Sequence, residues 1–266
     1  LFTETLNKYP HHKGSFKLWK EGIEKKLFRP QFHGREHLYV ERWMNALRMN
    51  LPETMIAFNL QMFGIGTTIT SEKRKSYLAA FDIDRPEDVN PVKEYISEGL
   101  QIFIELFGYS SKSFVAPNFF WPSWLEKVLF DHGVLFLQTQ RNQILPDIDS
   151  GKVKKIPHYT GQRNKYGQIY TVRNCIFEPS LYPKVDSLNT CLSHIYDAFR
   201  WGKPAIISTH RVNFIGSIVK SNRDNNLRIF TSLLKEIMKR WPDVEFMATD
   251  RLGCLIESNI RKHGHL

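Results

Sequence analysis

Short apolar runs of strand length alternate with segments of helical periodicity over most of this chain, and this alternation limits the fold more than any other feature. We expect strands at residues 78–83, 112–116, 134–140, 168–172, 175–177, 204–209 and 244–248. Several of the segments between them repeat apolar residues at the three- and four-residue spacing of a helix. Strands and helices that alternate in this way form a parallel sheet with helices packed outside it.

Start and stop signals mark several of the expected helices. Asn90 and Pro91 open the best-marked helix, and Gly108 ends it. Asp186 can cap another helix, which Gly202 ends. Further helices are expected from just after His37, from Pro122 to Gly133, and up to Pro242.

The fold class we expect is α/β, as a (β/α) barrel, distorted or incomplete, of the glycoside hydrolase and deacetylase type. A barrel is favoured over a doubly wound sheet because no glycine-rich phosphate loop follows any strand. The chain has 266 residues, 42% of them hydrophobic, and shows no repeat or linker, so we expect one domain over 1–266. It begins at Leu1 and not at Met, and we expect the N-terminal part of the domain to be missing.

Charge and cysteine content restrict the partners. The 37 Lys and Arg exceed the 27 Asp and Glu, and a net charge of +10 favours an anionic partner. The basic residues are scattered without a nucleic-acid motif, so we expect no nucleic acid, and no apolar run is long enough for a membrane span. The three cysteines are widely spaced, which predicts buried free thiols and leaves the compartment open, with the cytoplasm slightly favoured.

His33 and His37 form the most informative pair of side chains. They lie four residues apart where an expected strand gives way to a helix, so both imidazoles can point to one side and bind a single metal ion. A satisfied surface pair is the alternative. In a barrel of parallel strands, active sites gather at the carboxyl ends of the strands, which favours the metal site.

Two further segments place polar or aromatic side chains at expected strand ends. His210 follows the strand at 204–209 and can act as a general acid or base, or can be a histidine bonded to a carbonyl. The loop at 117–121 contains Asn118 and Trp121, which can bind and stack on a sugar, although aromatic residues also build cores.

The long polar segment at 141–183 interrupts the alternation of strands and helices. A loop of this length is usually functional. It can form a lid that contacts the substrate, or a purely structural hairpin. The lid residues would be His158, Arg163, Arg173, Asn174 and Glu178.

Taken in order, three short motifs resemble those of the polysaccharide-deacetylase (NodB-homology) superfamily of carbohydrate esterases. Residues 33–37 read His-Gly-Arg-Glu-His and are similar to its His-Ser/Thr-x-x-His metal motif. Residues 115–119 read Val-Ala-Pro-Asn-Phe and resemble its Arg-x-Pro-x-Gly/Tyr motif, and residues 206–210 read Ile-Ile-Ser-Thr-His and resemble its Ile-x-Leu-x-His motif. The resemblance spans most of the chain, and the first motif is the most specific.

The resemblance implies a metal-dependent hydrolase that removes acetyl groups from a polysaccharide or oligosaccharide. His33 and His37 would bind a divalent metal, by preference zinc, and His210 would protonate the leaving amine as the catalytic acid. The substrate-binding residues that it implies are Arg35, Glu36, Pro117, Asn118, Trp121 and Arg211.

The chain departs from the family pattern in two places. The family's paired aspartates precede the histidine motif, whereas no Asp precedes His33 here; Asp82 and Asp84 are possible substitutes, although a solvated or capping role suits them as well. The family's motif arginine is replaced by Val115, and Arg35, Arg141 or Arg211 would have to supply its charge.

These departures leave two alternatives to the deacetylase. One is a non-catalytic member of the same fold that binds a saccharide. The other is a glycosidase on a similar barrel that uses two carboxylates, with Glu36 and Asp250 as the first candidates.

Overall fold

The computed structural model describes residues 1–65, 76–148 and 152–263, so part of the long segment at 141–183 lies outside the described residues. Its helices are α1 (Phe2–Lys8), α2 (Ser15–Glu24), α3 (Val40–Arg48), α4 (Pro52–Asn59), α5 (Val89–Phe107), α6 (Leu125–Asp131), α7 (Ser187–Arg200), α8 (Lys220–Arg240) and α9 (Thr249–His263). Its strands are β1 (Ser113–Val115), β2 (Phe136–Thr139), β3 (Asn142–Pro146), β4 (Val153–Pro157), β5 (Ile169–Val172), β6 (Cys175–Ile176) and β7 (Ile207–Ser208). Short 3-10 helices lie at Pro10–His12, Pro86–Asp88, Pro117–Phe119 and Arg211–Phe214.

The parallel strands follow one another in chain order. Phe32 forms a parallel bridge with Phe114 in β1, β1 pairs with β2, and β2 pairs with β5. Two residues after β5, the chain continues as β6, which pairs in parallel with β7. Each of these strands is followed by a loop. In chain order, the loops contain His33, Pro117, Arg141, Arg173, Glu178 and His210.

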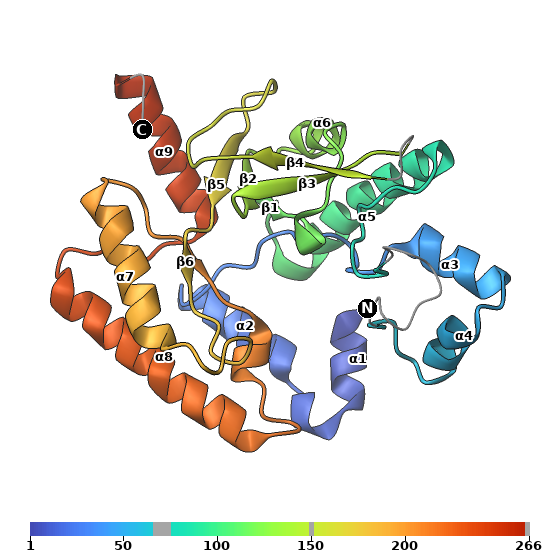
Figure 1. Cartoon of the computed structure of the whole chain (residues 1–266), viewed down its shortest axis with the longest axis horizontal. Helices are drawn as coiled ribbons and strands as arrows, with labels where there is room; N and C mark the ends of the chain where they lie inside the picture. Colours follow the sequence, from blue (N-terminus) through green and yellow to red (C-terminus); the bar gives the residue numbers. More distant parts are fainter. Residues whose placement is uncertain (66–75, 149–151, 264–266) are drawn as a thin grey trace.

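Helices cover both faces of the three-stranded sheet, which gives the central part of the molecule three layers (Figure 1). One face packs Phe114, Leu137 and Tyr170 into the main core with α5 and α6. The opposite face packs Phe136 and Ile169 against α9. Because alternate residues of a strand point to opposite faces, the register of β1, β2 and β5 assigns these side chains to their two layers.

A second core lies around β6 and β7. It includes Cys175 from β6, Cys191 from α7 and Leu233 from α8, and the two helices lie side by side in Figure 1. Burial raises the pKa of each of the two thiols to about 12. The prediction of buried free thiols is therefore confirmed for these two cysteines and wrong for Cys254, which is exposed on α9.

Several helix predictions are confirmed by the caps. Gly108 ends α5 with a left-handed φ of 76° and donates its N–H to the carbonyl of Ile104. The Asp186 side chain accepts a hydrogen bond from the backbone N–H of Asn189 at 3.0 Å and so caps α7. The helix expected just after His37 starts only at Val40, so the two histidines lie on an irregular segment that precedes α3.

Two predicted strands are wrong. Residues 78–83 are buried but form turns, in which the N–H of Asp82 bonds to the carbonyl of Ala79. Residues 244–248 also lack a ladder partner in the described structure, and Val244 instead bonds back to the carbonyl of Trp241. Apolar character alone cannot distinguish a buried strand from a buried turn, because it reports burial and not pairing.

Within the described residues the parallel strands form sheets of three and two strands, and no closed barrel of hydrogen-bonded strands is found. The (β/α) barrel stays a prediction, as does the assignment of the whole chain to one domain. Among the described helices, none combines the length and the apolar character that crossing a membrane requires.

Candidate functional site

The three histidines that the sequence singled out lie near one another at the ends of parallel strands. Burial lowers the pKa of His33 below its usual value of 6.5, and the hydrogen bond to Val115 opposes this shift. The positive charges of His37, Arg173 and His210 lower it further. His33 therefore shares an electrostatic neighbourhood with His37 of its own segment and with Arg173 and His210 from two other loops. We call these four residues and Glu178 the histidine cluster.

The imidazole of His33 is oriented by the backbone of β1. Its Nδ1 lies 2.7 Å from the carbonyl oxygen of Val115, so Nδ1 carries the proton and donates it to that oxygen. Its Nε2 is then unprotonated and has a lone pair for a metal ion. Although part of its surface remains exposed, the lowered pKa favours the neutral form that a metal ligand needs.

His37 completes a pair that fits one metal ion. Its ring centre lies 5.2 Å from that of His33. Two imidazoles that bind one tetrahedral ion at about 2.1 Å have ring centres roughly 5 Å apart. The Nδ1 atom of His37 is also buried without a hydrogen-bond partner among the described residues, and a buried polar atom without a partner costs free energy unless it is satisfied. Both observations are consistent with the residues of a metal site.

The described residues contain no group of three or more His, Cys, Asp or Glu side chains close enough to share an ion. Any metal ion held by His33 and His37 would therefore need its other ligands from water, from a substrate or from groups outside the described residues.

His210 is held by a buried carboxylate. Its Nδ1 lies 2.6 Å from Oε1 of Glu178, and its backbone N–H donates to Oε2 of the same residue at 3.2 Å. Glu178 is only 4% exposed, whereas 53% of the His210 side chain is exposed. Asn213 donates a further hydrogen bond to Oε2 at 2.8 Å. This arrangement fixes the proton on Nδ1 and leaves Nε2 on the exposed side of the ring to exchange a proton.

Arg173 is the arginine that joins this cluster. Its Nε and Nη2 donate to Oε1 of Gln138 at 2.9 and 2.7 Å, and its guanidinium lies 5.6 Å from the ring centre of Phe119. Burial lowers the pKa of Arg173, and the charge of Glu178 opposes this shift. From the sequence, Arg35, Arg141 or Arg211 was expected to supply the charge of the motif arginine that Val115 replaces. Arg173 was expected only as a residue of a possible lid.

A series of hydrogen-bonded polar side chains holds Gln138, the partner of Arg173, in place. Gln138 donates to the hydroxyl of Thr249 at 2.7 Å, and Gln31 donates to the same hydroxyl at 3.2 Å. Ser113 then donates to Gln31 at 2.7 Å. Residues of β1 and β2 and the start of α9 are thus connected to the arginine, which limits the directions that its guanidinium can take.

The predicted substrate-binding residues have mixed outcomes. The guanidinium of Arg35 pairs with Glu36 and with Glu98, so the charge of Arg35 is already engaged by two carboxylates. Trp121 was expected in a sugar-binding wall, but it is 2% exposed and donates its indole N–H to Glu126. It therefore belongs to the core. Arg211 is exposed next to His210, where it can reach a substrate.

The loop after β1 presents Asn118 to solvent. Pro117 is buried beneath it, and Asn118 and Phe119 both have left-handed backbone angles, with φ of 53° and 58°. Two consecutive non-glycine residues in this region are uncommon and cost free energy, and such strain is found most often at functional sites. The loop therefore agrees with a role for Asn118, while Pro117 acts by shaping the turn.

The remaining carboxylates of interest are paired elsewhere. Arg42 bonds to Asp82 at 2.7 Å and to Asp84 at 2.7 and 2.9 Å, in a network that is largely buried. Asp250 pairs with Arg29 at 2.5 Å. Asp82 is thus buried and paired with Arg42. Glu36 and Asp250, the two candidate glycosidase carboxylates, are paired with Arg35 and Arg29.

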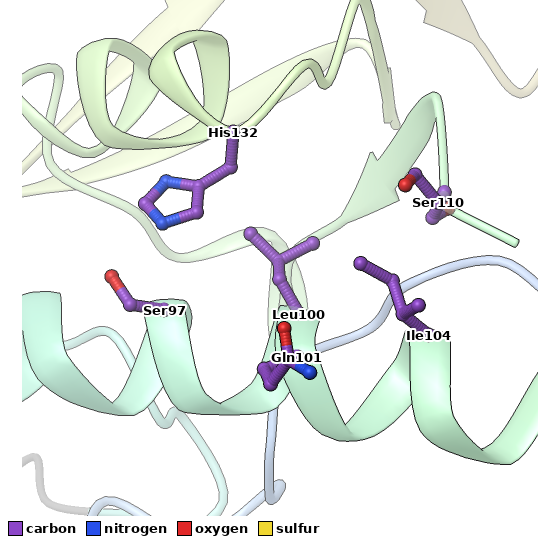
Figure 2. A pocket seen from close by; sticks show the side chains of 7 residues that line it. Ser97, Leu100, Gln101, Ile104, Ser110 and His132 are labelled. Carbon is purple, nitrogen blue, oxygen red and sulfur yellow. The ribbon is translucent and has the colours of Figure 1, made fainter.

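A separate small cavity of about 140 Å³ lies between α5 and the end of α6 (Figure 2). His132 faces Ser97 across it, and His132 is hydrogen-bonded through Nδ1 to the carbonyl of Val128. No residue of the histidine cluster lines this cavity, and its histidine has a structural partner.

The lowered pKa of His33 predicts how folding stability depends on pH. The unfolded chain binds a proton at this residue near pH 6.5, whereas the folded chain binds it only at lower pH. The contribution of His33 to stability is therefore complete above pH 6.5 and is lost as the pH falls through the lowered folded-state pKa. We expect the difference in unfolding free energy between wild type and His33→Ala, measured by urea unfolding, to be constant above pH 7. Below pH 6.5, wild type should lose stability relative to the variant. A difference that does not change with pH would contradict the assignment.

No model of a known protein family and no curated protein matches this chain. The arrangement of its side chains is therefore what supports a function.

Proposed function

We propose that this chain is a metal-dependent hydrolase that removes acetyl groups from a glycan, with His33 and His37 as metal ligands and His210 as the catalytic acid. One observation carries the proposal: His33, His37, Arg173, Glu178 and His210, which come from different loops, meet at the ends of the parallel strands. The chain order of the strands from Phe32 to β5 also supports the proposed (β/α) barrel, in which sites of this kind lie at the carboxyl ends.

Each residue of the cluster has a role that its contacts suggest. His33 and His37 would hold the metal, which when bound polarises a carbonyl oxygen and lowers the pKa of water. Glu178 keeps the Nδ1 proton of His210 in place, so that Nε2 can transfer a proton to the leaving nitrogen or oxygen. Arg173 supplies a positive charge close to the place where negative charge would develop on the acetyl group.

The test is metal content together with acetate release. We expect the purified chain to bind about one zinc or cobalt ion per molecule, as structural and catalytic zinc sites do. The His33→Ala, His37→Ala double variant should lose that ion and the release of acetate from acetylated oligosaccharides. His132→Ala is the matched control, since His132 is also an exposed histidine bonded to a backbone carbonyl, and it should keep both.

Absence of bound metal after incubation with excess zinc would contradict the hydrolase and favour the second candidate, a non-catalytic protein of the same fold that binds a saccharide. That candidate is supported by the lack of a third ligand among the described residues. It predicts saccharide binding that His33→Ala and His37→Ala leave unchanged.

A further inference from the structure

A pocket with a volume of about 770 Å³ is lined by basic residues and shares Arg173 with the histidine cluster. We call it the basic pocket. Among the residues that line it are Arg141, Tyr159, Arg163, Arg173, Lys203 and Ile260. Its volume lies within the range of about 300–1,000 Å³ that is typical of ligand sites.

The charges of the basic pocket all have one sign. Arg141, Arg163, Arg173 and Lys203 line it, and none of its described lining residues is acidic. Arg141 and Arg163 are exposed, and neither guanidinium has a hydrogen-bond or ion-pair partner among the described residues. Each of them therefore keeps five N–H donors in the planar arrangement that matches a carboxylate, sulfate or phosphate.

The wall that carries these arginines is held in shape before any ligand binds. The backbone N–H of His158 donates to the carbonyl of Arg141 at 2.7 Å. Gly161 and Gln162 exchange backbone hydrogen bonds with Tyr170 of β5 at 3.0 and 2.9 Å. A preformed wall lowers the entropy cost of ordering the pocket when a ligand binds, which favours tighter binding of an anion.

Two features favour a sugar acid over a nucleic acid as the ligand. Tyr159 lines the pocket and is 68% exposed, so its ring face is available to the apolar face of a pyranose. The cations lie in one concave pocket and do not form the extended basic track with several stacking platforms that a nucleic-acid strand needs. Arg173 both lines the pocket and belongs to the histidine cluster, so the two sites share one residue.

We propose that the basic pocket binds the acidic group of a sugar next to the acetylated one, so that the substrate is an anionic glycan. The assignment of the ligand as a substrate rests on the proposed hydrolase function, whereas the preference for a negative charge follows from the pocket alone. Arg141 and Arg163 are its specificity residues, and Arg173 links this subsite to the histidine cluster.

The test compares two hexasaccharides that carry N-acetyl groups, one with carboxylates and one without. A hyaluronan hexasaccharide alternates N-acetylglucosamine with glucuronate, and chitohexaose is neutral. By calorimetry we expect the full chain to bind the hyaluronan fragment at least about tenfold more tightly, because one charge-assisted hydrogen bond contributes that much. The Arg141→Gln, Arg163→Gln double variant should lose this preference. The Lys235→Gln, Lys239→Gln variant removes the same charge from exposed positions on α8 and should keep it.

Salt provides a second measurement that needs no variant. Rising ionic strength should weaken binding of the hyaluronan fragment and leave binding of chitohexaose unchanged, because screening acts on the charges alone. Equal affinity for the two sugars would overturn the inference, and so would equal losses in the pocket variant and the α8 variant. Tighter binding of a single-stranded oligonucleotide of equal charge, lost in the pocket variant, would overturn it in favour of a nucleic-acid site.

The outcomes for the inference and for the proposed function can be separated. If the hyaluronan fragment binds as expected and no acetate is released from either sugar, the hydrolase is wrong and the anionic subsite stands. If acetate is released equally fast from both hexasaccharides, the hydrolase stands and the anionic substrate class is wrong.

Discussion

On the proposed hydrolase function, the Glu178→Gln variant is expected to release acetate about 100-fold more slowly than wild type, or slower still, with its metal content unchanged. Glutamine has nearly the size of glutamate but cannot offer a negative oxygen to Nδ1 of His210, which now lies 2.6 Å from Oε1. The ring then loses the carboxylate that fixes its tautomer and balances the positive charge of the doubly protonated form, which is the form that can donate a proton from Nε2. Steady-state acetate release and elemental analysis measure the two quantities.

Glu236→Gln is the matched control for this variant. It removes a carboxylate that forms an ion pair with Arg240 on the surface of α8 and belongs to no part of the histidine cluster. It should change the rate of acetate release less than about twofold. A normal rate in Glu178→Gln, with His210→Ala still inactive, would show that the carboxylate does not orient the acid. Loss of metal in Glu178→Gln would show instead that the variant disturbs His33 and His37.

Arg42→Met is expected to have the largest effect on folding, with a loss of about 3–5 kcal/mol of unfolding free energy. The side chain of Arg42 is 2% exposed and that of Asp82 is 4% exposed, so the variant leaves the Asp82 carboxylate poorly solvated and without this counterion. It also removes one partner of Asp84. Burial lowers the pKa of Arg42 and both carboxylates raise it, with a net increase, which agrees with a guanidinium that stays charged in this network. Urea unfolding followed by circular dichroism measures the loss.

The triple variant Arg42→Met, Asp82→Asn, Asp84→Asn should recover a large part of that stability, because it removes the uncompensated charges together with the arginine. Arg261→Gln breaks an exposed pair with Glu257 and serves as the surface control, with an expected change of about 0–1 kcal/mol. A loss below about 1 kcal/mol in Arg42→Met would mean that the two aspartates find water or other partners.

His33, His37 and His210 could be selected from the sequence because each ends an apolar run that has strand character. Glu178 and Arg173 could not be selected with the same confidence, since both lie in a long polar segment where every charged side chain has a similar context. Glu178 reaches His210 from 32 residues away, and no local spacing encodes that contact.

Trp121 and residues 78–83 illustrate the opposite error. Trp121 follows a strand-end loop, and its position suggested a sugar-binding wall, yet its ring fills the main core. Residues 78–83 have the composition of a buried strand, yet they turn under the constraint of Arg42, which holds Asp82 and Asp84 from another part of the chain. In both cases the contacts include a partner distant in sequence, because Trp121 stacks on His158 and Arg42 bonds to Asp82.

The sequence by itself determined the ends of α5 and α7 and the burial of the apolar runs, because a cap or a left-handed glycine acts through hydrogen bonds within a few residues. It also determined which histidines are candidates. The tertiary structure alone decided which arginine and which carboxylate join them, and it gathered Arg141, Arg163 and Lys203 around one pocket. Those choices depend on charges that meet across separate loops, and electrostatic contact is set by distance in space and not by distance along the chain.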